Sequence, residues 1–166
     1  MSIYDIIGDF LLRLRFNHGV EELGEVEDLV HELAKLEEGA EATYILSLPG
    51  RPRPYLVTAL KTEEGYALAF LNLDDVRRLE GVSNVEELED ATTRFSVEKF
   101  GNPAPFLFPI KQEGEVVYAA MGFKTFVENL TAGNIEDLID QFELDSDAYF
   151  LELKKALTST STEGVE

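Results

Sequence analysis

Three apolar runs near the start of the chain are separated by breaks too short to hold a crossover connection. The runs cover residues 43–48, 55–61 and 66–72, and they are rich in the β-branched and aromatic residues that favour strands. The breaks are a proline-rich loop at 49–54 and a turn at 62–65. Because parallel neighbours need about a dozen or more connecting residues, these runs must pair antiparallel. The sequence therefore predicts a three-stranded meander.

A second hairpin is predicted further along, where the turn at 111–114 separates apolar runs at 106–110 and 115–121. Elsewhere apolar side chains recur at spacings of three and four residues, which is typical of amphipathic helices. Residues 94–100 are expected to form a strand or an irregular segment. The helical spacing predicts helices over 3–17, 20–38, 74–79, 83–90, 123–130, 135–142 and 146–157.

These elements predict an α+β fold, in which an antiparallel sheet of about five strands is packed with N- and C-terminal helices. No linker divides the chain, so we expect a single domain over residues 1–157. The last residues, 158–166, are small and polar, and we expect them to form a disordered tail.

The order of the predicted elements over roughly residues 3–157 is similar to that of type III secretion chaperones, which run helix, three strands, helix, two strands, helix. The similarity is one of topology. It implies a role in binding a partner protein.

The charge balance limits the kind of partner. The chain of 166 residues carries 33 acidic and 14 basic side chains, for a net charge of −19. An acidic surface repels phosphate backbones and anionic lipids, so we expect no direct nucleic-acid partner and no membrane partner. The same surface could imitate nucleic acid and occupy a nucleic-acid-binding enzyme, which stays open as an alternative.

The composition also bears on location. The chain has no cysteine, which excludes disulfides and thiolate metal sites and fits a reducing compartment. No apolar run reaches the roughly 20 residues that a membrane-spanning helix needs. The N-terminus lacks the basic start and cleavage site of a signal peptide. We therefore expect a cytoplasmic protein.

Sequence patterns of common active sites are missing. Neither a Walker phosphate loop nor GxGxxG nor GxSxG occurs. The acids Asp145 and Asp147 have the spacing of the first calcium-loop ligands, but no glycine or further oxygen ligand follows. We therefore expect no catalytic residues, no metal site and no cofactor.

Three groups of residues are candidates for contact with a partner protein. Arg51 and Arg53 lie in the proline-rich loop, where they would form a cationic tip suited to a carboxylate or phosphate. An acidic face of the predicted helix 20–38 would suit a basic surface. Aromatic residues near the second hairpin would form an apolar patch if exposed. The acidic and aromatic candidates are Glu21, Glu25, Glu32, Phe123 and Phe126.

The function we expect is that of a non-catalytic acidic protein-binding module, acting as an adaptor, a chaperone or a regulator of a partner with a basic or apolar surface. A homodimer is a further expectation, because the first helix also has a broad apolar face. Two alternatives remain open. One is a nucleic-acid-mimicking inhibitor, and the other is a small-ligand binder or an enzyme.

Overall fold

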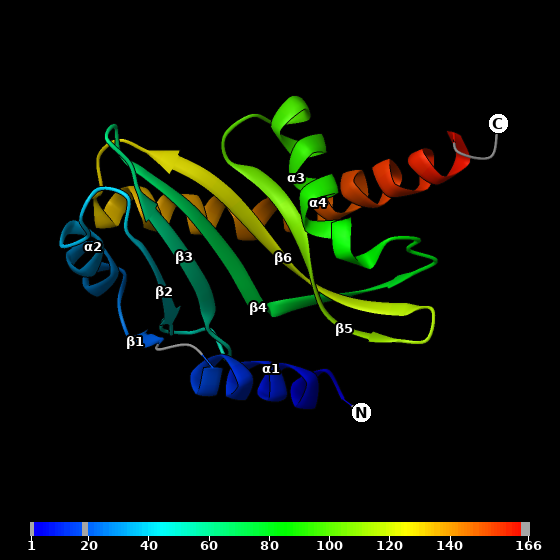
Figure 1. Cartoon of the computed structure of the whole chain (residues 1–166), viewed down its shortest axis with the longest axis horizontal. Coiled ribbons are helices and arrows are strands. Elements are labelled where there is room, and N and C mark those ends of the chain that lie inside the picture. The colour runs from blue at the N-terminus through cyan, green and yellow to red at the C-terminus, as the bar shows by residue number, and fades with distance from the viewer. Residues whose placement is uncertain (1, 18–19, 164–166) are drawn as a thin grey trace.

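A computed structural model describes residues 2–17 and 20–163 of the chain (Figure 1). In this part of the chain the strands form one six-stranded sheet in the order β1-β2-β3-β4-β6-β5. The α+β class predicted from the sequence is confirmed. The elements are α1 (Ile3–Asn17), β1 (Glu21–Leu23), α2 (Val26–Ala34), β2 (Glu41–Leu46), β3 (Tyr55–Lys61), β4 (Tyr66–Glu80), the short 3₁₀ helix η1 (Val85–Glu87), α3 (Leu88–Lys99), β5 (Ala104–Glu113), β6 (Val116–Val127) and α4 (Ala132–Glu163).

The predicted meander and hairpin are both present. Strands β2, β3 and β4 pair antiparallel in sequence order, and β5 pairs antiparallel with β6. The prediction of an antiparallel sheet of about five strands needs one correction, because β1 adds a sixth strand that runs parallel to β2. This strand has only three residues and no local strand pattern, so its pairing with Tyr44, Ile45 and Leu46 is what makes it a strand.

Strand β4 is longer than predicted and replaces the predicted helix 74–79. Its pairing with β6 shifts between Asn72 and Val76 and then continues to Glu80. Within the shift, the side-chain amide oxygen of Asn72 accepts a hydrogen bond from the backbone N–H of Asp74 at 3.0 Å. A hydrogen bond of this kind stabilises the local irregularity in the strand, and β4 pairs with β6 again after it.

Three further predictions about helices were wrong. Residues 123–127 belong to β6, because Phe123 is buried while Phe126 is exposed, which follows the two-residue period of a strand. Residues 88–99 form one helix, α3, in place of a predicted helix ending at 90 and a predicted strand or irregular segment at 94–100. The two predicted C-terminal helices are one helix, α4, in which Phe142 and Leu153 are buried on the same side.

The predicted tail covers residues 158–166. Its first part, 158–163, belongs to the end of α4, and residues 164–166 lie outside the described residues.

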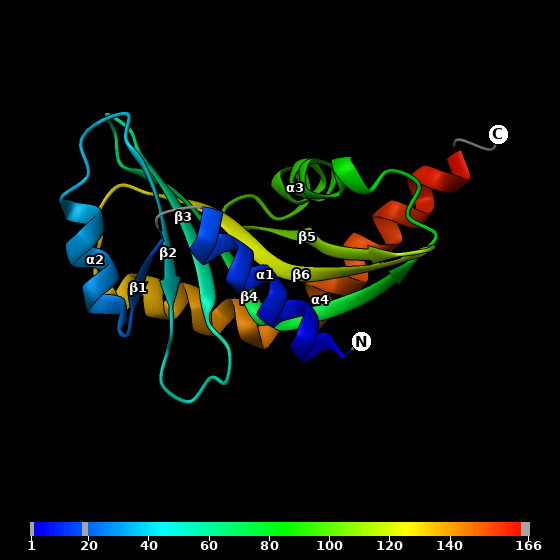
Figure 2. The same cartoon turned by 60° about the horizontal axis from the view of Figure 1, so that its bottom comes forward.

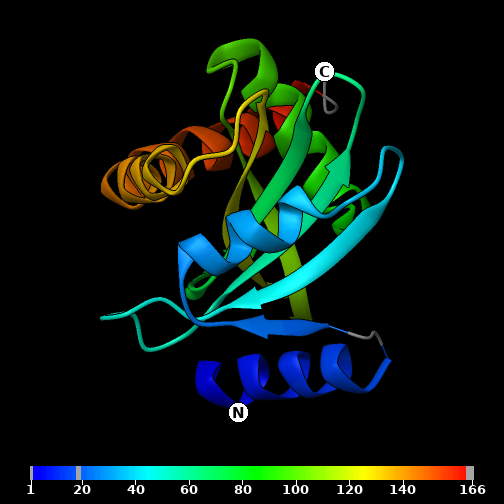
Figure 3. The same cartoon turned by 90° about the vertical axis from the view of Figure 1, so that its left-hand side faces the viewer.

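The two faces of the sheet are covered by different helices. Figure 3 shows α2 and α4 on one side of the sheet and α1 on the other. On the first side, the ring of Phe123 stacks on Phe70 with centroids 4.8 Å apart and lies 4.9 Å from the ring of Phe142 in α4. On the second side, Ile6 and Ile7 of α1 are buried in a smaller apolar cluster with residues such as Leu71 and Phe106.

The outer edge of β5 is protected against further strand pairing. The backbone N–H of Leu107 points away from β6 and donates to the hydroxyl of Thr92 in α3 at 3.0 Å. Alternate residues of a strand direct their N–H groups to the same side, and the neighbours of Leu107 on that side are Pro105 and Pro109. Proline has no N–H, so this stretch offers no free donor to an added strand.

A helix that crosses a membrane needs about 20 mostly apolar residues in a row. No helix in the described part of the chain combines the length and the apolar character that such a span needs.

Gly122 lies in the middle of β6, where there is no room for a side chain. A Cβ atom at this position would lie 2.5 Å from the carbonyl oxygen of Phe70 and 2.7 Å from the ring of Phe106. We predict that Gly122→Ala lowers the free energy of unfolding by about 2–3 kcal/mol, because a backbone atom of β4 has to move. Urea denaturation followed by circular dichroism measures this change.

The matched control is Gly133→Ala at the start of α4, where an added Cβ has no neighbour within 4 Å. We expect that control to change the free energy of unfolding by less than about 1 kcal/mol. Equal effects of the two substitutions would contradict the packing described for β6.

Candidate functional site

The sheet face that carries α1 is only partly covered by that helix. Beyond the rows that contact α1, the same face continues along β3, β4 and β6. Two rows run across these strands, because Thr58 pairs with Ala69 and Ala69 with Lys124, while Leu60 pairs with Ala67 and Ala67 with Phe126. We call this surface the open half of the sheet and define it by Thr58, Leu60, Ala67, Ala69, Lys124 and Phe126.

The open half forms the floor of a groove with a volume of about 550 Å³. Figure 2 shows the surroundings, with α1 crossing the sheet in front and α3 lying above. Val97, near the end of α3, lines one wall and is 55% exposed. Phe126 belongs to the floor and is 37% exposed. Exposed apolar side chains that line one depression are typical of a binding surface.

The floor of the groove is mostly apolar, and its central side chains are small. Ala67 and Ala69 have only a methyl group, so an approaching molecule can come close to the backbone of β4. The charged residues among those lining the groove are Glu41 and Lys124. Lys124 is already paired with Glu89 of α3 at 2.9 Å, and its ammonium lies 5.1 Å from the centre of the Phe106 ring. Its charge is therefore largely satisfied within the chain.

The segment that closes one end of the groove is held in place by Asn102. Its side-chain amide donates to the backbone carbonyl of Phe126 at 3.2 Å and accepts from the backbone N–H of the same residue at 3.1 Å. This pair of bonds imitates one step of strand pairing. These bonds join the segment before β5 to Phe126 in the floor of the groove.

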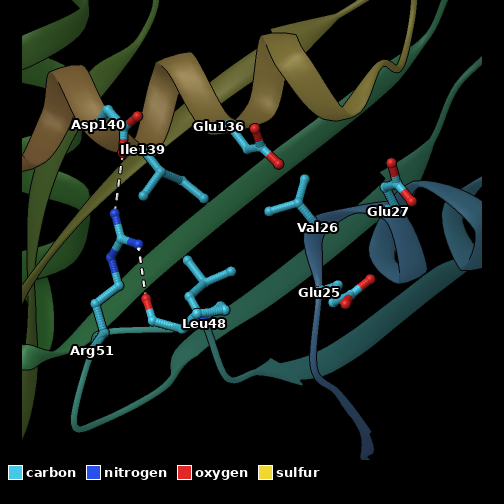
Figure 4. Close-up of a pocket in the computed structure, with 9 residues that line it drawn as sticks. Glu25, Val26, Glu27, Leu48, Arg51, Glu136, Ile139 and Asp140 are labelled. Atoms are coloured by element: carbon cyan, nitrogen blue, oxygen red, sulfur yellow. Dashed lines mark hydrogen bonds and ion pairs between the residues drawn. The ribbon is translucent and has the colours of Figure 1, made fainter.

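A second groove, of about 470 Å³, lies between the start of α2, the loop before β3 and α4 (Figure 4). Figure 4 shows carboxylates of Glu25 and Glu27 on one side and of Glu136 and Asp140 on the other. Arg51 lies among the lining residues and bonds Asp140 at 3.1 Å. This acidic groove contains two of the residues that the sequence singled out, Arg51 and Glu25.

Arg51 is bound within the chain by more than one acid. Its guanidinium donates to both carboxylate oxygens of Glu143 in α4, at 2.8 and 3.0 Å. Tyr55 donates its hydroxyl to the same carboxylate at 2.7 Å. Burial alone would raise the pKa of Glu143, but the hydrogen bonds from Arg51 and Tyr55 outweigh it and hold that pKa below its usual value. Burial, together with the bond to Glu143, raises the pKa of Tyr55, which keeps its hydroxyl protonated.

Arg53, two residues on, contacts the opposite side of the sheet. Its guanidinium donates to Asp74 at 2.6 Å and lies 3.9 Å from the centre of the Tyr4 ring in α1. The proline-rich loop therefore connects α4 to the sheet through Arg51 and α1 to the sheet through Arg53. In the described structure neither arginine forms the free cationic tip that the sequence suggested.

The remaining candidates from the sequence lie apart from one another. Glu21 is exposed in β1, Glu25 precedes α2, and Glu32 in α2 pairs with Lys35 at 3.3 Å, so the three do not form one helical face. Phe123 is buried in the core, and Phe126 lies in the open half. Of the seven candidates, Phe126 is the one that the structure brings to the apolar groove.

Sequence reasoning did not single out Leu60, Ala67 or Ala69. A signal was present, because small residues alternate with large ones in the run Ala67, Leu68, Ala69, Phe70. That alternation shows two different faces of one strand, and the face with the smaller side chains is the open one.

In comparisons with known proteins, no family model, no characterised protein and no solved structure matches the chain. No comparison therefore supports the similarity in element order to type III secretion chaperones. Among the described residues, no group of three or more histidine, aspartate or glutamate side chains is arranged to hold a metal ion.

The bonded carboxylate of Glu143 predicts a pH-dependent contribution to stability. We expect Glu143→Gln to lower the free energy of unfolding at pH 7 by on the order of 1–2 kcal/mol. A carboxyl with a lowered pKa in the folded state stabilises the fold above its ordinary value of 4.5 and loses that effect as the pH falls through the folded value. The difference between wild type and variant should therefore be constant from pH 7 to about 5 and shrink below that.

Chemical denaturation across this pH range measures the difference. Glu136→Gln, an exposed acid on the same helix, is the matched control and should cost less than about 0.5 kcal/mol at pH 7. A difference for Glu143→Gln that stays constant down to pH 3 would contradict this account.

Proposed function

We propose that the chain is a non-catalytic protein-binding module of the cytoplasm, and that the open half of the sheet receives an amphipathic helix of a partner protein. The observation that supports this most is the uncovered apolar surface. One face of the sheet is packed by α2 and α4, and α1 covers part of the other, but no helix of the described residues lies on the rows of Ala67 and Ala69. Burying such a surface is favourable in proportion to the apolar area removed from water.

A helix suits the open half better than an added strand. The neighbouring rows of the same face already accept one amphipathic helix, α1, through Ile6 and Ile7. The alanine floor leaves room for the larger side chains of a second helix. Strand addition at β5 is disfavoured by Pro105 and Pro109.

The charge of the chain indicates the chemistry of the partner's other face. With a net charge of −19, the chain attracts a basic segment at long range and repels an acidic one. Glu41 adds a negative charge at the groove itself, whereas Lys124 is paired with Glu89. We therefore propose a helix with an apolar stripe and a basic opposite face.

The nucleic-acid-mimicking alternative has less support. Such a mimic presents rows of carboxylates on a face without cations, whereas Arg51 lies inside the acidic groove. The open half, which is apolar, has no role in that alternative.

The test uses a synthetic helix of leucine and lysine whose leucines form one stripe, titrated into the protein and followed by amide and methyl NMR shifts. We expect the largest shifts at Leu60, Ala67 and Ala69. Ala69→Lys places a charged side chain in the floor and should weaken binding by about tenfold. Leu144→Lys, at an exposed position of α4, is the matched control for the change in charge and should leave binding nearly unchanged.

Two further peptides complete the design. A scrambled peptide of the same composition has no apolar stripe, and a leucine and glutamate peptide has the stripe but the opposite charge. Both should bind more weakly than the first. The proposal is wrong if the shifts map to α2 and α4, or if Ala69→Lys and Leu144→Lys weaken binding equally.

A further inference from the structure

Helix α1 lies across one face of the sheet (Figure 2), and its side that faces away from the sheet carries a row of largely exposed side chains. Tyr4, Gly8, Leu12 and Phe16 are spaced four residues apart, so they form one line along the helix. The side chains of Tyr4, Leu12 and Phe16 are 70%, 64% and 91% exposed. Ile6 and Ile7, on the inner side, already account for the packing of α1 on the sheet. We call the four residues the outer row.

A charged row runs beside the outer row. Asp5, Asp9 and Arg13 are also four residues apart, and all three are exposed. The acids therefore lie in the first half of α1 and the arginine in the second. Arg15 brings the net charge of α1 to zero, in a chain whose total is −19. The α1 helices of two copies of the chain would therefore repel each other only weakly.

We propose that two copies of the chain pair through α1 in antiparallel orientation, with the two-fold axis close to Phe10. This pairing places Tyr4 of one copy opposite Phe16 of the other, and Leu12 opposite Gly8. Arg13 of one copy comes level with residue 7 of the other, between Asp5 and Asp9. A two-fold axis brings the same flank of both helices together, so Arg13 of each copy lies beside acids of the other copy.

Gly8 supports this pairing independently. Glycine inside a helix lowers its stability relative to alanine, and a Cβ at Gly8 would have no neighbour within 4 Å. Packing within the chain therefore does not require a glycine here. In the antiparallel pair the missing side chain leaves space for Leu12 of the second copy.

The remaining contacts of α1 present the outer row in a fixed position. The guanidinium of Arg53 lies on the ring of Tyr4, and Arg15 bonds Glu22 at 3.1 Å. The pairing does not depend on the proposed function, because the open half of the sheet is formed by other residues.

Sedimentation equilibrium over a range of protein concentrations tests the pairing. We expect reversible dimers whose affinity rises between about 50 and 300 mM NaCl, because salt screens the repulsion between two acidic chains but does not weaken the burial of apolar side chains. Leu12→Glu should weaken the dimer at least about tenfold. Leu144→Glu, which makes the same change at an exposed site of α4, is the matched control and should leave it unchanged.

Cross-linking tests the orientation, because the natural chain has no cysteine. A mixture of Tyr4→Cys and Phe16→Cys chains should form a mixed disulfide under mild oxidation. Neither variant should form a disulfide by itself. In a dimer of one variant, the introduced cysteines of the two copies would lie about 18 Å apart along the helices, whereas a disulfide needs Cα atoms about 6 Å apart.

The outcomes separate clearly. Dimers that Leu12→Glu weakens and that give the mixed disulfide support the proposal. Disulfides within each single variant would show a parallel pair and overturn it. A monomer at every concentration, or a dimer that responds to Leu144→Glu and not to Leu12→Glu, would overturn it as well.

Discussion

The long pairing of β4 with β6 is the interaction on which the rest of the structure depends. It runs from Tyr66 opposite Val127 to Glu80 opposite Val116, with one shift after Asn72. On one side it carries β3, β2 and β1, and on the other it carries β5. Phe70 and Phe123, which pair across the two strands, supply the rings on which α4 packs. Gly122, on the opposite face, leaves space for Phe106.

The uncovered part of the sheet follows from the size of its elements. A helix is about 10 Å across, whereas alternate residues of a strand are about 7 Å apart along it. A helix seated over the row of Leu71 therefore does not reach the rows of Ala69 and Ala67. The other face is covered by two helices, one of them 32 residues long. One face of the sheet is thus covered by helices, whereas part of the other face remains exposed and apolar.

The sequence predicted those elements whose signals are local. Proline, glycine and charged turns marked both the meander and the hairpin. It failed where tertiary contact decides the outcome. Residues 74–79 resemble a helix in pattern, but Val76 and Leu79 find partners on β6 and remain in a strand. The acids and serine at 145–147 suggested a helix boundary, yet the Ser146 hydroxyl donates to the carbonyl of Glu143 and α4 continues.

The candidate residues show the same limit. Phe123 and Phe126 would share a face in a helix, but in a strand they lie on opposite faces, so one is in the core and the other in the groove. The sequence alone indicates no ion-pair partner for Arg51 or Arg53. Their partners, Glu143 and Asp74, are far away along the chain and belong to no recognisable motif. A groove made by alanines on adjacent strands has no sequence signature until the register of the strands is known.

The exposure of the open half is the central claim, and methyl relaxation with a soluble paramagnetic agent measures it directly in the isolated protein. We predict strong relaxation of the methyl groups of Leu60, Ala67 and Ala69, and weak relaxation of those of Leu71, which lies on the same face beneath α1. Equal protection of all four residues would show that this half of the sheet is covered, and would contradict the account.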